Sequence, residues 1–177
     1  LRMTKEKEVI IHHDPHIKNI PIDSLTVAEI KKIDRDVITL QELFDFVKKI
    51  EFNLEMKWNV PATDRSVFAQ KVVDLVQKNG VKKRVAYSSF DEEILLEVQK
   101  LDPSAKIGFL EDKSLERLLE VGNVLKARVL SPHHTMLTNK ESVKRLQSRG
   151  SHVIPWTVNE LTRLKELVDM GVDGVIT

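Results

Sequence analysis

The sequence predicts an α/β fold built on a parallel β-sheet, and three observations lead to this prediction. From residue 51 onward, short runs rich in β-branched residues alternate with longer segments whose apolar residues recur at three- and four-residue steps. Predicted strands after residue 84 start about 21 to 25 residues apart, the length of one βα unit. No glycine-rich phosphate-binding motif follows a strand, which excludes the usual dinucleotide and P-loop folds. An open doubly wound sheet and a (β/α)8 barrel both fit this pattern.

The elements after residue 51 can be assigned in order. The predicted strands are 51–57, 84–89, 106–110, 127–131, 152–158 and 174–177. The predicted helices between them are 66–80, 90–103, 114–127, 139–150 and 159–171. Three of these helices end in glycine and one in Asp-Pro, which are common helix stops. The pattern gives six βα units, two fewer than a closed barrel needs, so either the sheet is open or two strands precede Leu1.

The first 50 residues do not repeat the βα pattern. Residues 1–15 are typical of a turn and an extended strand, whereas 24–33 and 39–50 are typical of helices. Ser24, and either Asp36 or Thr39, are reasonable residues to begin these helices. We therefore expect residues 1–177 to form one domain, with a hairpin and insertion region over 1–50 and the six βα units over 51–177.

The composition excludes several classes of function. The 177 residues are 41% hydrophobic and 31% charged, which suits a folded domain with a core. The 28 basic and 27 acidic residues are mixed along the chain, so we expect no nucleic-acid partner. The chain has no cysteine, which excludes disulfides and thiolate metal sites and favours a reducing compartment such as the cytoplasm. No apolar run of about 18 residues is present, so we expect no transmembrane segment.

Polar side chains follow several predicted strands. In a (β/α)8 barrel the catalytic groups stand at the C-terminal ends of the strands. Here those ends carry Glu55, Lys57, Ser89, Ser131 and Trp156. Strand alternation places Asn53, Glu55 and Lys57 on one face, and Phe52, Leu54 and Met56 on the other. Glu55 and Lys57 would form either an internal ion pair or a site, with Glu55 as an oxygen ligand for a divalent cation and Lys57 facing an anionic substrate.

The histidines fall into two pairs and two single residues. His12 and His13 precede Asp14 at the end of an apolar strand, and alternation turns them to opposite faces, so at most one should join a site. A histidine beside a carboxylate could transfer a proton, or it could be an inert surface residue. His133 and His134 follow a strand, and one of them is a candidate for substrate contact, although Ser-Pro is also ordinary loop sequence.

The remaining candidates have weaker patterns. We expect His16 to lie on a surface loop and His152 to be structural, because it begins its strand. Trp156 ends a predicted strand, where an indole could form the wall of a substrate pocket or pack in the core.

Six motifs in order resemble the glycerophosphodiester phosphodiesterase family. They are "LRMTKEKEVIIHHDP", "ITLQELF", "NLEMK", "VAYSSF", "VIPWTVN" and "GVDGVIT", and they span nearly the whole chain. The resemblance implies a (β/α)8 barrel with a small insertion, and an enzyme that uses Ca²⁺ or Mg²⁺ to hydrolyse glycerophosphodiesters to glycerol 3-phosphate and an alcohol. The alternatives are a related phosphodiesterase acting on lysophospholipids and a barrel without catalysis that serves as a binding or regulatory module.

The resemblance also implies roles for individual residues. His13, rather than His12, matches the general acid/base, Glu55 matches a metal-binding carboxylate, and Lys57 matches the lysine that contacts the substrate phosphate. We expect Ser89, His133 and Trp156 to contact the substrate, which is a small molecule. The family pattern opens with a His-Arg-Gly strand and a Glu-x-Asp strand, which we expect before Leu1, and its connection near Asp34 and Arg35 is longer than the one here.

Overall fold

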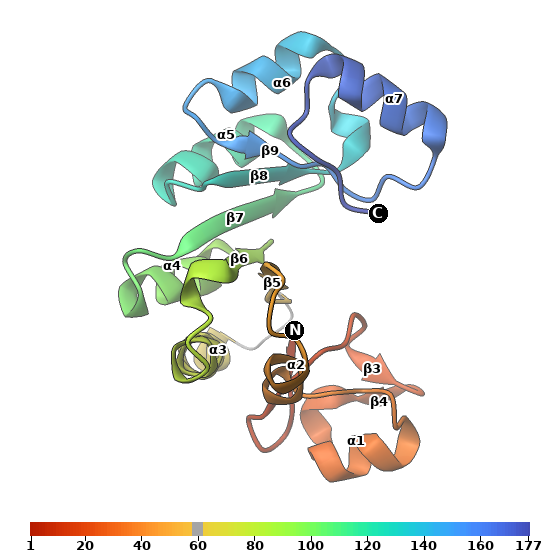
Figure 1. Ribbon diagram of the computed structural model, residues 1–177, viewed down its shortest axis with the longest axis vertical. Coiled ribbons are helices and arrows are strands. Elements are labelled where there is room, and N and C mark those ends of the chain that lie inside the picture. Colours follow the sequence, from red (N-terminus) through yellow and green to blue (C-terminus); the bar gives the residue numbers. More distant parts are fainter. Residues whose placement is uncertain (58–61) are drawn as a thin grey trace. The chain divides into compact units, whose positions relative to one another are not determined.

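The computed structural model describes residues 1–57 and 62–177 (Figure 1). The chain divides into two compact units, which we call unit 1 (residues 1–105) and unit 2 (residues 106–177).

Unit 1 begins with two small antiparallel hairpins. The first pairs β1 (Arg2–Met3) with β2 (Val9–Ile10), and the second pairs β3 (His16–Ile17) with β4 (Ile20–Pro21). A 3-10 turn η1 (Ile22–Ser24) and the helices α1 (Val27–Ile33) and α2 (Leu40–Phe46) follow. Buried aliphatic side chains hold this region together: Ile10, Ile17, Ile22, Ile30 and Val37.

The two helices of this region begin at threonines. Thr26 and Thr39 each accept a hydrogen bond from the backbone N–H three residues later, and a glutamate there returns the bond in a capping box. The prediction that Thr39 begins a helix is confirmed, whereas the prediction that Ser24 begins one is wrong. Ser24 has no acidic partner three residues later, while Thr26 has Glu29.

The remainder of unit 1 contains two βα units. The strands β5 (Phe52–Glu55) and β6 (Val85–Ser89) pair in parallel. The helices are α3 (Arg65–Lys78) and α4 (Glu92–Leu101), with short 3-10 turns η2 (Ala62–Asp64) and η3 (Lys82–Arg84) before α3 and β6. The predicted alternation along β5 is confirmed, because Phe52, Leu54 and Met56 are buried while Asn53 is exposed.

Unit 2 contains three further βα units. The strands β7 (Lys106–Glu111), β8 (Val129–Pro132) and β9 (His152–Val153) pair in parallel in that order. The helices α5 (Leu115–Val124), α6 (Lys140–Gln147) and α7 (Leu161–Met170) alternate with them, and a 3-10 turn η4 (His134–Met136) follows β8. Helix α5 packs on β7 and β8, and α6 packs on β9.

Two of the three glycines expected to end helices do so: Gly80 follows the last capping residue of α3, and Gly171 caps α7. Helix α6 already ends at Gln147 with Ser148 as its cap, two residues before Gly150. Gly80, Gly150 and Gly171 have φ angles of 65°, 81° and 91°, the left-handed conformation that glycine adopts most easily. The alternation of strands and helices that the sequence predicts is therefore formed in both units.

Two predicted strands are shorter than expected or absent. The run 152–158 forms a strand only at His152–Val153, because Pro155 has no backbone N–H, and Trp156 then makes a single bridge to His133. Residues 174–177 form no strand, although Ile176 exchanges two backbone hydrogen bonds with Pro155 and Val158. No helix in residues 1–57 and 62–177 is long and apolar enough to cross a bilayer.

Candidate functional site

Glu55 and Lys57 form an ion pair at the end of β5. Lys57 Nζ lies 2.6 Å from Glu55 Oε1, and the side chains are 11% and 28% exposed, respectively. The ion pair, one of the two arrangements that the sequence allowed, is therefore present. It is compatible with a functional role, because a carboxylate has a second oxygen and an ammonium has three donors.

Asp14 accepts a hydrogen bond from the ring of His13. His13 Nδ1 lies 2.8 Å from Asp14 Oδ1, and the His13 side chain is 83% exposed. The hydrogen bond from His13 lowers the pKa of Asp14, and the charges of His13, His12 and Arg2 act in the same direction. An ionised carboxylate only accepts hydrogen bonds, so in the neutral form of His13 the ring proton lies on Nδ1, and Nε2 is the nitrogen that can accept a proton.

His12 contacts the same residue through a different atom. Its Nδ1 lies 2.9 Å from the backbone oxygen of Asp14. Strand alternation predicted that His12 and His13 face opposite sides, but both rings contact Asp14. The alternation does not apply here, because β2 ends at Ile10 and the backbone turns before Asp14. Of these two histidines, His13 is the one that bonds to the Asp14 carboxylate.

The first two residues connect the His13 loop with the Glu55 strand. The Leu1 backbone nitrogen donates to Glu55 O (2.5 Å), and Leu1 O accepts from Lys57 N (3.3 Å). The Arg2 guanidinium donates to the backbone oxygen of His13 from Nε (3.2 Å) and Nη2 (2.7 Å). Burial lowers the pKa of Arg2, while the charges of Asp14 and Glu55 oppose this effect. The general acid/base candidate and the Glu55–Lys57 pair thus both lie near Arg2.

Ser89 has a structural role. Its side chain is fully buried, its hydroxyl donates to Met56 O (2.7 Å), and it accepts from Asp91 N (3.0 Å). These bonds join the ends of β5 and β6 and use the hydroxyl within the protein. The structure therefore offers no support for the predicted contact between Ser89 and substrate.

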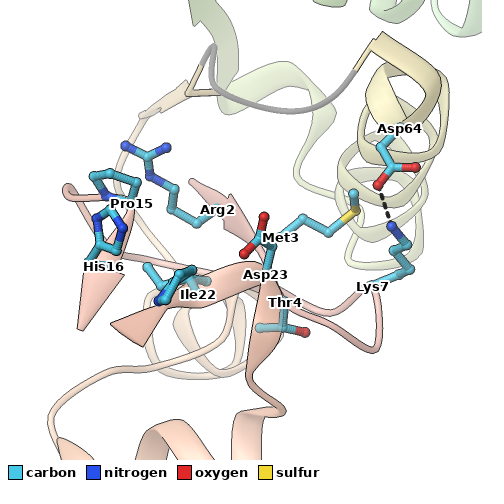
Figure 2. A pocket seen from close by; sticks show the side chains of 10 residues that line it. Arg2, Met3, Thr4, Lys7, Pro15, His16, Ile22, Asp23 and Asp64 are labelled. Carbon is cyan, nitrogen blue, oxygen red and sulfur yellow. Dashed lines mark hydrogen bonds and ion pairs between the residues drawn. The ribbon is translucent and has the colours of Figure 1, made fainter. Parts of the chain in front are cut away.

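A cavity of about 300 Å³ lies beside the His13 loop (Figure 2). Its walls come from both hairpins, η1 and η2, and include Arg2, Met3, Pro15, His16, Asp23 and Asp64. Lys7 and Asp64 form an ion pair on one side of it. His16, which we predicted to be on a loop, lies in β3 instead, although it is exposed as expected.

Unit 2 brings His133 and Trp156 together at the ends of β8 and β9. Their ring centroids are 5.0 Å apart with an interplanar angle of 81°, an edge-to-face contact. Trp156 Nε1 donates to Ser131 O (2.9 Å), and His133 Nδ1 lies 2.8 Å from Thr135 Oγ1. The two side chains form an aromatic pair, which we call the aromatic wall, with polar ring nitrogens that are hydrogen-bonded.

Two charged residues near His133 and Trp156, Glu111 and Arg163, were not among the residues predicted from the sequence, whereas the neighbouring His134 was. The Glu111 carboxylate, buried at the end of β7, accepts hydrogen bonds from the backbone of Asp112 and Lys113. Arg163 donates to the backbone oxygens of His134 (2.5 Å) and Leu137 (2.7 Å). Burial lowers the pKa of His134, and the charges of His133 and Arg163 add to the effect. Glu111 could have been found as a polar residue at the C-terminal end of a strand, whereas no sequence signal points to Arg163.

The described residues do not form a metal site by themselves. Within residues 1–57 and 62–177, no three His, Asp or Glu side chains are arranged so that they could hold an ion. Ca²⁺ takes about six to eight oxygen ligands, whereas Mg²⁺ is often bound through one or two carboxylates together with water and substrate phosphates. Glu55 fits a site of the Mg²⁺ type, in which one protein carboxylate is joined by water and substrate phosphate.

Comparisons with known proteins give a consistent result. The profile of the Glycerophosphoryl diester phosphodiesterase family matches residues 1–177. A glycerophosphodiester phosphodiesterase from Caldanaerobacter subterraneus is 25% identical, over 100% of this chain and 79% of that protein. One from Bacillus subtilis is 27% identical, over 100% of this chain and 71% of that protein. A lysophospholipase D from Rattus norvegicus is 22% identical, over 99% of this chain and 71% of that protein.

The fold comparison agrees. The crystal structure of a glycerophosphodiester phosphodiesterase from Thermotoga maritima matches with a TM-score of 0.81 at 27% identity, over 99% of this chain and 78% of that one. The predicted α/β class is confirmed, and of the two closures that the sequence pattern allowed, the TIM (β/α)8 barrel is the one supported.

Proposed function

Because the chain belongs to the glycerophosphoryl diester phosphodiesterase family, we propose that it hydrolyses glycerophosphodiesters to glycerol 3-phosphate and an alcohol. Family membership confirms the expectation that the chain is an enzyme. The observation that carries the proposal for the site is the His13–Asp14 hydrogen bond, which leaves Nε2 free, in the same unit as the Glu55–Lys57 pair.

The proposed reaction needs one proton acceptor and one proton donor. A water oxygen forms a bond to phosphorus, and the bond from phosphorus to the alcohol oxygen breaks. Water loses one proton and the leaving alkoxide gains one, and His13 Nε2 exchanges a proton with one of these oxygens. The ammonium of Lys57 stabilises negative charge on the phosphate oxygens.

We further propose that Glu55 supplies one oxygen ligand to a divalent cation, Mg²⁺ or Ca²⁺. When bound, the cation would offset charge on the phosphate and so favour attack at phosphorus. His133 and Trp156 are proposed to contact the substrate, because an aromatic wall with a polar edge suits the carbon chain and hydroxyls of a glycerol or an alcohol group.

Hydrolysis of lysophospholipids is the second candidate function. The match to a lysophospholipase D supports it. A panel of glycerophosphocholine, glycerophosphoethanolamine and lysophosphatidylcholine separates the two, because the preferred substrate has the highest kcat/KM.

Turnover of glycerophosphocholine with Mg²⁺ or Ca²⁺ tests the proposal in the complete protein. We expect release of glycerol 3-phosphate, and a loss of about 10²- to 10⁴-fold in kcat for His13→Ala and for Glu55→Gln. His12→Ala is the matched control, because the His12 ring bonds to the backbone oxygen of Asp14, whereas the His13 ring bonds to its carboxylate.

Two results would contradict these assignments. Near wild-type turnover in both His13→Ala and Glu55→Gln would refute the site. An absence of turnover on every substrate of the panel would favour the third possibility, a barrel that binds ligand without catalysis.

A further inference from the structure

Arg2 is a buried cation whose hydrogen bonds go to the backbone beside a candidate catalytic group. Its side chain extends from β1 toward the segment that contains Pro15 and His16 (Figure 2). Only 9% of the residue is exposed, and both Nε and Nη2 donate to the backbone oxygen of His13. A planar guanidinium that grips one oxygen with two N–H groups fixes that oxygen in direction as well as distance.

Burying the charged guanidinium of Arg2 costs free energy, and filling the same space with an apolar side chain would not. A buried charge loses its hydration, and an apolar side chain of similar volume often stabilises such a position better. Within the described part of the chain, the Nη1 nitrogen of Arg2 is buried without a hydrogen-bond partner, which adds to the cost. The contacts that Arg2 does make are therefore a better explanation of its presence than its contribution to stability.

The His13 ring needs such support because it is itself open to solvent. With 83% of its side chain exposed, little packing restrains the ring. Asp14 holds Nδ1, but Asp14 is also exposed, so the ring and its partner would move together. The carbonyl between these two residues is the point at which the backbone of both can be fixed.

We propose that Arg2 is a positioning residue for His13, which holds the backbone of the His13–Asp14 pair so that the ring presents Nε2 in one direction. The inference rests on the proposed function of His13 as acid/base. The charged groups near Arg2 are Asp14 and Glu55, and those near the Asp14 carboxylate are His12, His13 and Arg2.

Three variants of the complete protein test the inference, with glycerophosphocholine as substrate. Arg2→Met fills the buried space without donors, and we expect kcat to fall about 10- to 100-fold because the reacting geometry is lost. KM should change less than about threefold, because Arg2 does not bind substrate. Arg2→Lys keeps the charge and one donor nitrogen in place of the two that reach His13 O, and it should recover part of the loss. Arg84→Met is the matched control, because Arg84 also donates to a backbone carbonyl, that of Ile50, away from His13.

A spectroscopic measurement separates positioning from simple loss of folding. ¹⁵N chemical shifts of the His13 ring should report the proton on Nδ1 in the wild-type protein, and a move toward the Nε2-protonated form in Arg2→Met. Circular dichroism gives the folded fraction, and kcat is expressed per folded molecule.

The outcomes distinguish this inference from the proposed function. Wild-type kcat in Arg2→Met while His13→Ala is inactive would overturn only the positioning role. A loss of kcat that matches the loss of folded protein, or that Arg84→Met reproduces, would also overturn it. If Arg2→Met does not fold, the test uses Arg2→Lys alone. Wild-type kcat and wild-type ring shifts in Arg2→Lys would then overturn the positioning role of Arg2. Full activity of His13→Ala would instead refute the proposed site.

Discussion

The proposed acid/base His13 and the carboxylate of Asp102 differ in exposure and in their hydrogen-bond partners. His13 is exposed and keeps one ring nitrogen free, whereas Asp102 is 3% exposed and its carboxylate has several partners. Lys82 Nζ lies 2.9 Å from Asp102 Oδ1, and Ser104 donates to the same oxygen from its backbone and hydroxyl. The family resemblance pointed to His13, the histidine directly before Asp14, whereas Asp102 was predicted only as part of an Asp-Pro helix stop. Its partners depend on how the chain folds back after α4.

We predict that Asp102→Asn lowers the free energy of unfolding by about 2 to 3 kcal/mol at pH 7, because a hydrogen-bonded buried charge is lost. Burial alone would raise the pKa of Asp102, but the bonds from Lys82 and Ser104 outweigh it and lower that pKa. A carboxyl with a lowered folded pKa stabilises the protein above its unfolded pKa, near pH 4, and this contribution is lost as pH falls through the folded value.

Urea unfolding at pH 7 and at pH 3 measures this effect. The difference between wild type and Asp102→Asn should shrink at pH 3, because this pH lies below the unfolded pKa and the stabilisation by the charge declines there. An equal difference at both values would show that the charge is not the cause. Asp102→Ala serves as a control that removes both charge and hydrogen bonds.

At the scale of elements, close packing of helix on sheet depends on a small residue in α5. Gly122 is buried, and a Cβ atom at this position would lie 2.5 Å from Leu130 Cδ2 on β8. Leu130 is itself 3% exposed and has little room to move. The sequence predicted the helix and the strand, but it did not show that Gly122 faces Leu130, because periodicity gives a face and not its partner.

We predict that Gly122→Ala lowers the free energy of unfolding by about 1 kcal/mol. Alanine gains about 1 kcal/mol in helix propensity, but overpacking of the core costs about 1 to 3 kcal/mol. Leu130→Val in the same chain should recover part of the loss, because it shortens the opposing side chain. A double-mutant cycle by urea unfolding measures this coupling, and strictly additive effects would contradict the contact.

At the scale of the whole molecule, the comparisons establish the family and the barrel class, and several properties remain predictions. These are the single-domain organisation of 1–177 and the lack of a nucleic-acid partner. The presence of a divalent cation is also a prediction, since the described residues offer Glu55 but no cluster of ligands. A bound ion stabilises the entire native state, so its effect can be measured globally.

We predict that Mg²⁺ or Ca²⁺ raises the thermal unfolding midpoint of the complete protein and that a chelator removes turnover. A ligand at 100 times its Kd stabilises the native state by about 2.7 kcal/mol. Glu55→Gln should respond less to the ion in calorimetry, while Glu116→Gln, an exposed carboxylate in α5, should respond like wild type. Unchanged turnover in the presence of chelator would contradict the metal proposal.

The sequence by itself determined the features that depend on neighbours along the chain. The alternation of strands and helices, the burial of Phe52, Leu54 and Met56, and two glycine helix stops at Gly80 and Gly171 follow from local periodicity and backbone preference. The motif order, which pointed to the family, also lies in the sequence alone.

Only the tertiary structure decided which distant groups meet. It joined the guanidinium of Arg2 to the carbonyl of His13, placed His133 against Trp156, and used the hydroxyl of Ser89 inside the protein. Each of these contacts links segments whose approach depends on the packing of the elements between them. A local pattern can show that a residue lies at the end of a strand, but whether its polar atoms stay free depends on what the fold brings to them.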